Sequence, residues 1–314
     1  MSEILAKYEK KHRRLRINGM FYASLSSASF GFSPLFSLGL LAAGLSNFDV
    51  LSYRWLVAGI VLMVYAVCKK KSLRLNSFDE AWKIIVLSLL RAATSLTLLI
   101  GYANISSGIS STINFMYPVI VTLCMMIFFG EKRTWVDFIA IAGSFFGVYL
   151  FASGDSIIVE GGNTTLGLVC SIISAFTYAA YYILMKQLKA DKIEVVKFTT
   201  WIMMLTALYF MAAAFIFEDG ITIVTNGRSW LNILGLGLWS TMVSNFTAVK
   251  AIRRIGPTIT SILGALQPLT AVILGVLFLG EHLYLRSCIG ISCILIAVTI
   301  IVMHQQGSGS KVKS

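Results

Sequence analysis

Long apolar runs separated by short polar segments make up most of this chain. Each run has about the ~20 residues that an α-helix needs to cross ~30 Å of hydrocarbon. The pattern predicts an all-α membrane protein with ten transmembrane helices. We place them at 19–44, 50–68, 82–103, 107–129, 134–153, 165–185, 196–217, 230–250, 257–279 and 284–303.

Composition agrees with a protein whose solvent is lipid. Hydrophobic residues make up 57% of the 314 positions and charged residues only 13%. A water-soluble domain of this length could not bury so much apolar surface, whereas a bilayer removes that requirement. The lipid bilayer is therefore one expected partner.

One pattern recurs in the two halves of the chain. Pro118 opens an apolar run that ends at Gly130-Glu131, and Pro268 opens another that ends at Gly280-Glu281. Such a period indicates two structural repeats. We expect five-helix repeats at 19–153 and 165–303. A basic cytoplasmic tail precedes them at 1–18, and a C-terminal tail or linker remnant follows at 304–314.

The positions of Lys and Arg predict the orientation. Most of the 26 Lys and Arg residues fall in alternate connecting segments, whereas the opposite loops hold only Arg228 and Arg286. By the positive-inside rule both termini face the cytoplasm and the protein lies in the cell (inner, cytoplasmic) membrane. The net charge of +12 then needs no nucleic acid to explain it.

An odd number of helices per repeat gives the two halves opposite orientations. The result is a pair of inverted five-helix repeats related by a pseudo-two-fold axis in the membrane plane. Transporters built in this way bind their solute near the midplane, between the halves, and expose the site to each side in turn.

Three stretches of the chain resemble the EamA family of the drug/metabolite transporter superfamily. They are Phe30-Gly31-Phe32-Ser33 to Tyr53-Arg54-Trp55, Met116-Tyr117-Pro118 to Glu131, and Gln267-Pro268 to Glu281. The similarity covers about residues 19–303. It implies a transporter of small-molecule solutes with a central cavity lined mainly by helices 1, 3, 4, 6, 8 and 9.

Arg91 is the most unusual polar residue, because it lies near the predicted bilayer centre. A buried cation there costs ~2.5 kcal/mol or more and should face a cavity or a partner. Ser95 and Tyr102 share its helical stripe. Arg91 is either a counter-ion for a solute carboxylate or phosphate, or a structural residue that binds backbone carbonyls.

A second polar stripe recurs in both repeats. Ser110, Asn114 and Tyr117 share one helix face just before Pro118, and Gln267 occupies the matching place before Pro268. A proline removes one backbone hydrogen bond, which a membrane helix tolerates where polar groups compensate. The stripe lines the cavity, or its small polar residues join packed helices.

Aromatic residues supply further candidates. Trp239 lies deep in the eighth predicted helix, with Asn245 nearby, and an indole there could stack on a ligand or pack between helices. Tyr178, Tyr181 and Tyr182 are weaker candidates of the same kind. Near the outer end of the second helix, we expect Arg54 to reach the headgroups and Trp55 to anchor the interface.

The sequence has no sign of an enzyme. No Asp or Glu lies deep in a predicted helix, and no metal-ligand spacing or cofactor motif is present. We therefore expect no metal and no cofactor. The predicted function is a secondary transporter for an amino-acid-like or other anionic or zwitterionic metabolite, by export or exchange. A channel-like facilitator and a membrane-embedded enzyme are the alternatives, and the protein is expected to be a monomer or homodimer.

Overall fold

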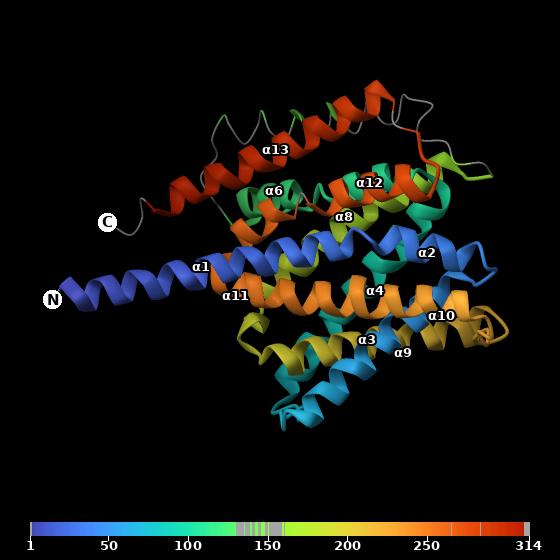
Figure 1. Cartoon of the computed structure of the whole chain (residues 1–314), viewed down its shortest axis with the longest axis horizontal. Coiled ribbons are helices and arrows are strands. Elements are labelled where there is room, and N and C mark those ends of the chain that lie inside the picture. The colour runs from blue at the N-terminus through green and yellow to red at the C-terminus, as the bar shows by residue number, and fades with distance from the viewer. Residues whose placement is uncertain are drawn as a thin grey trace.

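The protein is seen here in a computed structural model. It describes residues 2–129, 161–264, 266–282 and 284–310, with scattered positions between 135 and 159. These residues fold almost entirely into helices (Figure 1). The helices are α1 Ser2–Phe30, α2 Ser33–Leu41, α3 Asn47–Cys68, α4 Phe78–Asn104, α5 Ser107–Asn114, α6 Tyr117–Phe129, α8 Thr164–Gln187, η2 Ala190–Lys192, α9 Val195–Phe217, α10 Gly227–Leu234, η3 Gly235–Val243, α11 Ser244–Leu263, α12 Leu266–Phe278 and α13 Leu285–Ser310.

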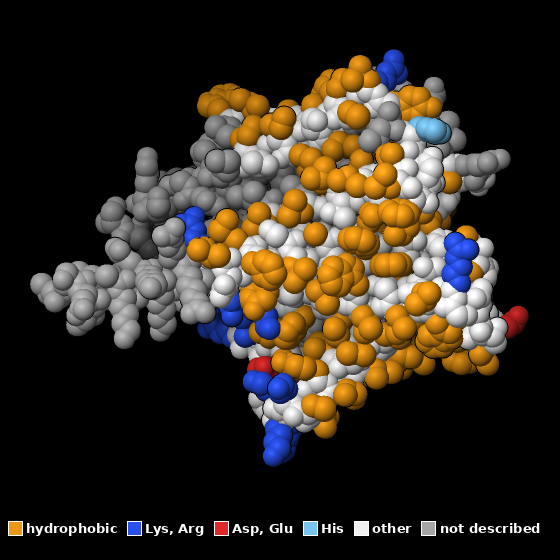
Figure 2. Space-filling view, in the orientation of Figure 1, with side chains coloured by type: hydrophobic (Ala, Val, Ile, Leu, Met, Phe, Trp, Pro, Cys, Tyr) orange, Lys and Arg blue, Asp and Glu red, His pale blue; other side chains and the backbone are white. Residues whose placement is uncertain are grey.

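Five described segments are long and apolar enough to cross a membrane. They span Arg16–Leu41, Asn47–Cys68, Phe78–Asn104, Thr164–Gln187 and Val195–Phe217, and shorter apolar helices lie at Leu266–Phe278 and Cys288–Ala297. Hydrophobic side chains spread across the middle of the face seen in Figure 2, while Lys and Arg lie toward its edges. This distribution is typical of a protein surrounded by lipid.

Helices that are distant in the chain pack side by side. The principal neighbours are α1 with α11, α4 with α8, and α3 with α9. The beginning of α1 and the end of α13 lie on the same side of the bundle (Figure 1). Each of these pairs packs a helix of the N-terminal half of the chain against a helix of the C-terminal half.

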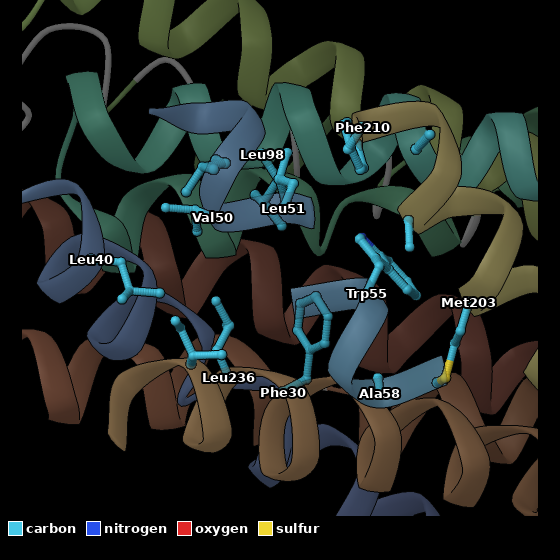
Figure 3. Packing of buried hydrophobic residues seen from close by; sticks show 14 of the residues in the cluster. Phe30, Leu40, Val50, Leu51, Trp55, Ala58, Leu98, Met203, Phe210 and Leu236 are labelled. Atoms are coloured by element: carbon cyan, nitrogen blue, oxygen red, sulfur yellow. The ribbon is translucent and has the colours of Figure 1, made fainter. Parts of the chain in front are cut away.

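The largest apolar core lies between α3, α4 and α9 and includes α2 and η3. Trp55, Leu51 and Ala58 of α3 are completely buried there against Met203 and Phe210 of α9 (Figure 3). An aromatic side chain of this size contributes a large apolar area to such a core. The expectation that Trp55 is an interfacial anchor is therefore wrong.

Three helical rods are interrupted. The helix formed by α1 and α2 breaks at Gly31-Phe32, that formed by α5 and α6 breaks at Phe115-Met116, and α11 ends shortly before α12 begins. The second and third breaks precede Pro118 and Pro268, whose missing N–H groups cannot continue the ladder. At the first break, a Cβ on Gly31 would lie 2.5 Å from Cβ of Thr270, so only glycine permits this approach.

The helix ends differ from the sequence-based expectation. Residues 2–18, expected as a tail, belong to α1, and α13 extends to Ser310. Residues 251–256, expected as a loop, continue α11 through a basic segment. Charges limit how deep a segment enters the bilayer but do not end a helix, because Lys and Arg are good helix formers. The predicted helix at 134–153 lies largely outside the described residues.

Candidate functional site

Arg91 of α4 lies in the interior of the helix bundle with 3% of its surface exposed. Its Nη2 donates a hydrogen bond of 2.7 Å to Oδ1 of Asn245. Three rings surround its guanidinium carbon, with centroids at 5.5 Å for Trp55, 5.0 Å for Tyr178 and 5.3 Å for Tyr181. The sequence placed Arg91 and Asn245 in the site separately, and the structure brings them into direct contact.

Arg54 of α3 joins the same cluster. It is 2% exposed, and its Nε donates a hydrogen bond of 2.7 Å to the hydroxyl of Thr241. Its guanidinium carbon lies 5.4 Å from the ring centroid of Phe30 and 5.6 Å from that of Trp55. The expectation that Arg54 reaches the headgroups is wrong, because its side chain turns inward toward η3.

Local structure explains why Arg54 reaches Thr241. A capping box between Ser46 and Asp49 fixes the start of α3. Where α3 passes the π-helical η3, a Cβ on Gly237 would lie 2.9 Å from the side chain of Val57. The wider turn of η3 presents Thr241, whose hydroxyl also donates to the Leu236 carbonyl. Such π-helical segments often occur at functional sites.

The cluster has an excess of positive charge. In the part of the chain that the structure describes, the ion pairs found do not include Arg54 or Arg91. A cation–π contact contributes ~0.5–2 kcal/mol, whereas removing an ion from water costs several kcal/mol. The aromatic rings therefore offset only part of the burial cost, and an anion would offset much more.

Within the part of the chain that the structure describes, three buried N–H donors of this cluster have no acceptor. They are Nη2 of Arg54, Nε1 of Trp55 and Nε of Arg91. Buried donors normally find a partner, and an unmet donor costs ~1–3 kcal/mol. All three can donate and none can accept, so the arrangement suits a ligand rich in oxygen acceptors.

The second predicted stripe lies next to this cluster. Ser110 pairs with the Ser171 hydroxyl at 2.8 Å, and Asn114 donates to the Ser174 hydroxyl at 2.9 Å. These four side chains therefore join α5 to α8 by hydrogen bonds. Joining packed helices is one of the two roles that the sequence left open for this stripe.

Tyr117 connects the stripe to Arg91. Its ring centroid lies 4.7 Å from that of Tyr178 and 5.0 Å from that of Tyr182. Tyr178 in turn contacts the Arg91 guanidinium. The aromatic wall of the site therefore extends from α6 across α8 to α4.

The remaining sequence candidates occupy different places. Ser95 and Tyr102 are buried on α4, and Ser111 donates to the Tyr102 hydroxyl at 3.3 Å. Gln267 is buried, and its Nε2 has no hydrogen-bond acceptor among the described residues. Trp239 is 43% exposed and meets Phe32 edge-on at 6.4 Å, so the structure does not bring it to the Arg residues.

A small cavity lies beside Tyr181 and Asn245, which both contact Arg91. It has a volume of about 10 Å³ and is lined by Tyr181, Phe198, Thr199, Ile202, Met203, Asn245 and Val249. That volume holds about one water molecule. A metabolite would enter only after the surrounding helices separate.

Polar contacts join the two halves at the Lys/Arg-rich end of the bundle. The Lys197 ammonium group lies 2.5 Å from the Glu80 carboxylate and 3.3 Å from the Arg74 carbonyl. Next to it, the Trp201 indole donates to the Leu73 carbonyl at 2.8 Å. The segment between α3 and α4 is thereby attached to the start of α9.

Polar contacts also join the two halves at the opposite end of the bundle. There the second half supplies the connecting segment and the first half supplies the start of a helix. The Thr222 backbone N–H donates to the Asp49 carboxylate at 2.9 Å, and the Ser46 hydroxyl donates to Glu218 at 2.6 Å. Here the segment after α9 is attached to the start of α3. Both ends of the interface between α3 and α9 are therefore held closed.

Sequence reasoning missed Arg54 and Trp55, and it ranked Tyr178 and Tyr181 low. Position along the helix placed Arg54 and Trp55 near a membrane surface. To find them, one would need to know that α3 packs against η3 and α9. The residue pattern of a single helix does not carry this information.

These observations define a helical membrane protein with a buried, positively charged, aromatic-walled site between its two halves. The model of the EamA-like transporter family matches the chain twice, at residues 17–153 and 165–303. The chain belongs to this family, whose members are membrane transporters, and the recognition made from the sequence is confirmed.

Curated relatives support the assignment over most of the chain. The chain is 24% identical over 253 residues to the uncharacterized inner membrane transporter YedA of Escherichia coli K12, covering 80% of this chain and 79% of YedA. It is 25% identical over 279 residues to the chloramphenicol-sensitive protein RarD of Pseudomonas aeruginosa, covering 85% and 88%. Protein PecM of Dickeya dadantii is 23% identical over 250 residues, covering 79% and 80%.

A solved crystal structure has the same fold. It aligns with a TM-score of 0.63 at 14% identity and covers 92% of this chain and 96% of its own. At this level of identity the likeness concerns the fold alone.

Proposed function

We propose that this protein is a secondary transporter that moves a small metabolite with an anionic part across the cell membrane by alternating access. Arg91 holds the anionic group of an amino-acid-like or other anionic or zwitterionic solute. Transport proceeds by export or exchange of the solute. The protein spans the membrane with ten helices arranged as two inverted repeats, 19–153 and 165–303, and both termini are cytoplasmic.

Helix packing supports the inverted repeat. Residue numbers shifted by the interval from Pro118 to Pro268 make α1 the counterpart of α8, and α4 the counterpart of the rod formed by η3 and α11. The shift therefore maps the pair α4 and α8 onto the pair α11 and α1, and both pairs are in contact. The contact between α3 and α9 maps onto itself. A two-fold relation between the halves accounts for all three pairings.

Interrupted helices support a site at the interface between the halves. The break at Gly31, the breaks before Pro118 and Pro268, and the π-helical η3 all occur within long apolar rods. Transporters of inverted-repeat type build their solute sites from such discontinuous helices. Irregular backbone within a membrane persists where it is buried in protein or lines a cavity.

The contacts at the two ends support alternating access. Glu80 and Lys197 hold one end of the α3–α9 interface, and Asp49 and Thr222 hold the other. Release of one set with retention of the other would open the Arg91 site to one side only. The seven-residue cavity beside Tyr181 and Asn245 would then widen toward that side.

The observation that carries this proposal is the buried Arg91, which is paired with neutral Asn245 and whose Nε has no acceptor among the described residues. A guanidinium fork suits a carboxylate or phosphate, and Lys does not reproduce its geometry. The test begins with thermal-shift screening of the purified protein against carboxylates and phosphates, each with its neutral amide or alcohol.

Counterflow in proteoliposomes then compares wild type, Arg91→Gln and Arg91→Lys. Both variants should lose most transport of the acid found in the screen, while the exposed control Arg228→Gln transports it normally. Normal transport by the Arg91 variants would remove Arg91 from the site. Equal loss for the acid and its amide would show that Arg91 is structural.

A further inference from the structure

We propose that Arg54 and Arg91 bind the solute together and that this solute carries two negative charges, as small dicarboxylates and phosphate monoesters do. This inference rests on the proposed transport function and adds a substrate class to it. Arg54 becomes a residue that determines specificity, a role that its position near a predicted helix end does not suggest.

The two guanidinium groups share one indole. The carbons of Arg54 and Arg91 lie 5.6 Å and 5.5 Å from the ring centroid of Trp55. Both Arg side chains come from the first half of the chain, on the neighbouring helices α3 and α4. Two like charges buried beside the same ring repel each other, because the low dielectric screens them weakly.

The groups that face these cations are neutral. Arg54 donates to Thr241 and Arg91 donates to Asn245, and the rings around them belong to Phe30, Trp55, Tyr178 and Tyr181. Within the described residues, the ion pairs involve other side chains. One carboxylate would neutralise only one of the two guanidinium groups and leave the other unpaired.

The unpaired donors are distributed over both cations. Among the described residues, Nη2 of Arg54, Nε of Arg91 and Nε1 of Trp55 have no acceptor. Trp55 is fully buried and the two Arg side chains nearly so, so bulk water does not satisfy these groups. A ligand with several acceptor oxygens at two charged positions would satisfy all three.

Contacts with aromatic rings alone do not offset the free-energy cost of burying both Arg54 and Arg91. Each ring contact is weak compared with the desolvation of an ion, and the two cations have one indole, that of Trp55, in common. Thr199 and Asn245 line the small cavity and supply further polar contacts for a bound solute. The cavity widens when the halves separate, so a dianion would enter as one end opens.

The experiment measures how affinity depends on ligand charge in full-length protein in lipid nanodiscs. Isothermal titration calorimetry compares two matched pairs of probes, succinate with succinamate and methyl phosphate with dimethyl phosphate. The titrations are made at about pH 8, above the second phosphate pKa of ~6, so each pair offers a dianion and a monoanion of similar size. Tighter binding of succinate than of methyl phosphate indicates a dicarboxylate site, and the reverse order indicates a phosphate site.

We expect wild type to bind the dianion of at least one pair ~10-fold or more tightly than its monoanion. In Arg54→Gln and in Arg91→Gln, dianion and monoanion should bind about equally, because one guanidinium remains. Arg54→Lys should keep part of the preference, since it keeps the charge. Arg228→Gln, with an exposed Arg, should match wild type.

Several outcomes would overturn the paired site. They are equal binding of dianion and monoanion by wild type, no binding of either dianion, or an unchanged ratio in Arg54→Gln. The wild-type comparison needs no variant, so it decides even if a variant does not fold. Suppose that these titrations rule out joint binding by Arg54 and Arg91, but Arg91→Gln still abolishes transport of a monoanion. The proposed transport function then stands, and only the substrate class is wrong.

Discussion

The Glu80 carboxylate of α4 and the Lys197 ammonium group of α9 lie 2.5 Å apart and join the two halves of the chain at the Lys/Arg-rich end. Their side chains are only 11% and 8% exposed. The ion pair therefore holds closed an end that must separate if the solute is to reach Arg91 from this side.

Lys197→Gln should weaken this closure. The loss of stability should fall between the ~1 kcal/mol of an exposed pair and the ~3–5 kcal/mol of a fully buried one. A Cys introduced at Thr199, in a Cys-free background, should react faster with a membrane-impermeant thiol reagent in inside-out vesicles.

The matched control for the ion pair is Lys83→Gln. It removes a contact with Asp79 within one helix turn, where the acid is 66% exposed, and should change stability little. Exchange of the two charges, Glu80→Lys with Lys197→Glu, should restore slow labelling. If the single variant labels at the wild-type rate, the pair does not control access.

The Glu281 carboxylate stabilises the start of α5. It accepts hydrogen bonds from the Ser106 hydroxyl at 2.7 Å and from the Ser107 backbone N–H at 2.6 Å. Glu281→Ala should lower stability by ~1–2 kcal/mol, and Glu281→Gln by less, because the amide oxygen can still accept. Thermal unfolding in detergent measures both.

Gly275 tests the same contact from the other side. A Cβ at this position would lie 2.5 Å from a carboxylate oxygen of Glu281. Gly275→Ala should therefore be harmful in wild type and much less so in Glu281→Ala, since contacting residues are not additive. Additive losses in the double variant would show that the carboxylate is not what restricts position 275.

Gly31 should tolerate no side chain. In Gly31→Ala the new Cβ would lie 2.5 Å from Cβ of Thr270 and 2.8 Å from the Gln267 carbonyl. Such overpacking typically costs ~1–3 kcal/mol. We expect a lower melting temperature and reduced transport, with partial recovery on adding Thr270→Gly. Gly227→Ala is the control, because nothing lies within 4 Å of that position.

Orientation can be tested in whole cells with a Cys-free background. A Cys at exposed Thr225 should react with an impermeant reagent from outside. A Cys at exposed Lys189 should react only after permeabilisation, because the positive-inside rule places this segment in the cytoplasm. Labelling of position 189 in intact cells would refute the inverted arrangement of the halves.

Much of the fold could be predicted from the sequence because a bilayer imposes a simple length requirement. The spans at 50–68, 82–103, 165–185 and 196–217 coincide closely with α3, α4, α8 and α9. Less could be predicted where the apolar pattern continues through a backbone change. The break at Gly31 is such a case, because it depends on Thr270 from the other half of the chain.

For the site residues, the sequence predicted the position along each helix but not the direction of each side chain. Counting along α4 placed Arg91 deep in the membrane, and the structure buries it. Counting along α3 placed Arg54 near a surface, yet it is equally buried, because η3 and α9 cover that face. Depth along a helix follows from sequence, whereas the direction of a side chain depends on which helices are its neighbours.

The charge of this site comes entirely from one copy of the duplicated unit. The interval between Pro118 and Pro268 relates Arg91 to Thr241 and Arg54 to Met204. Thr241 is the side chain to which Arg54 donates its hydrogen bond. Two identical copies joined in this way would bring four guanidinium groups together in the lipid interior. With both copies in one chain, the first supplies the two cations and the second supplies their neutral partners Thr241 and Asn245, a division of roles that a dimer of identical chains could not have.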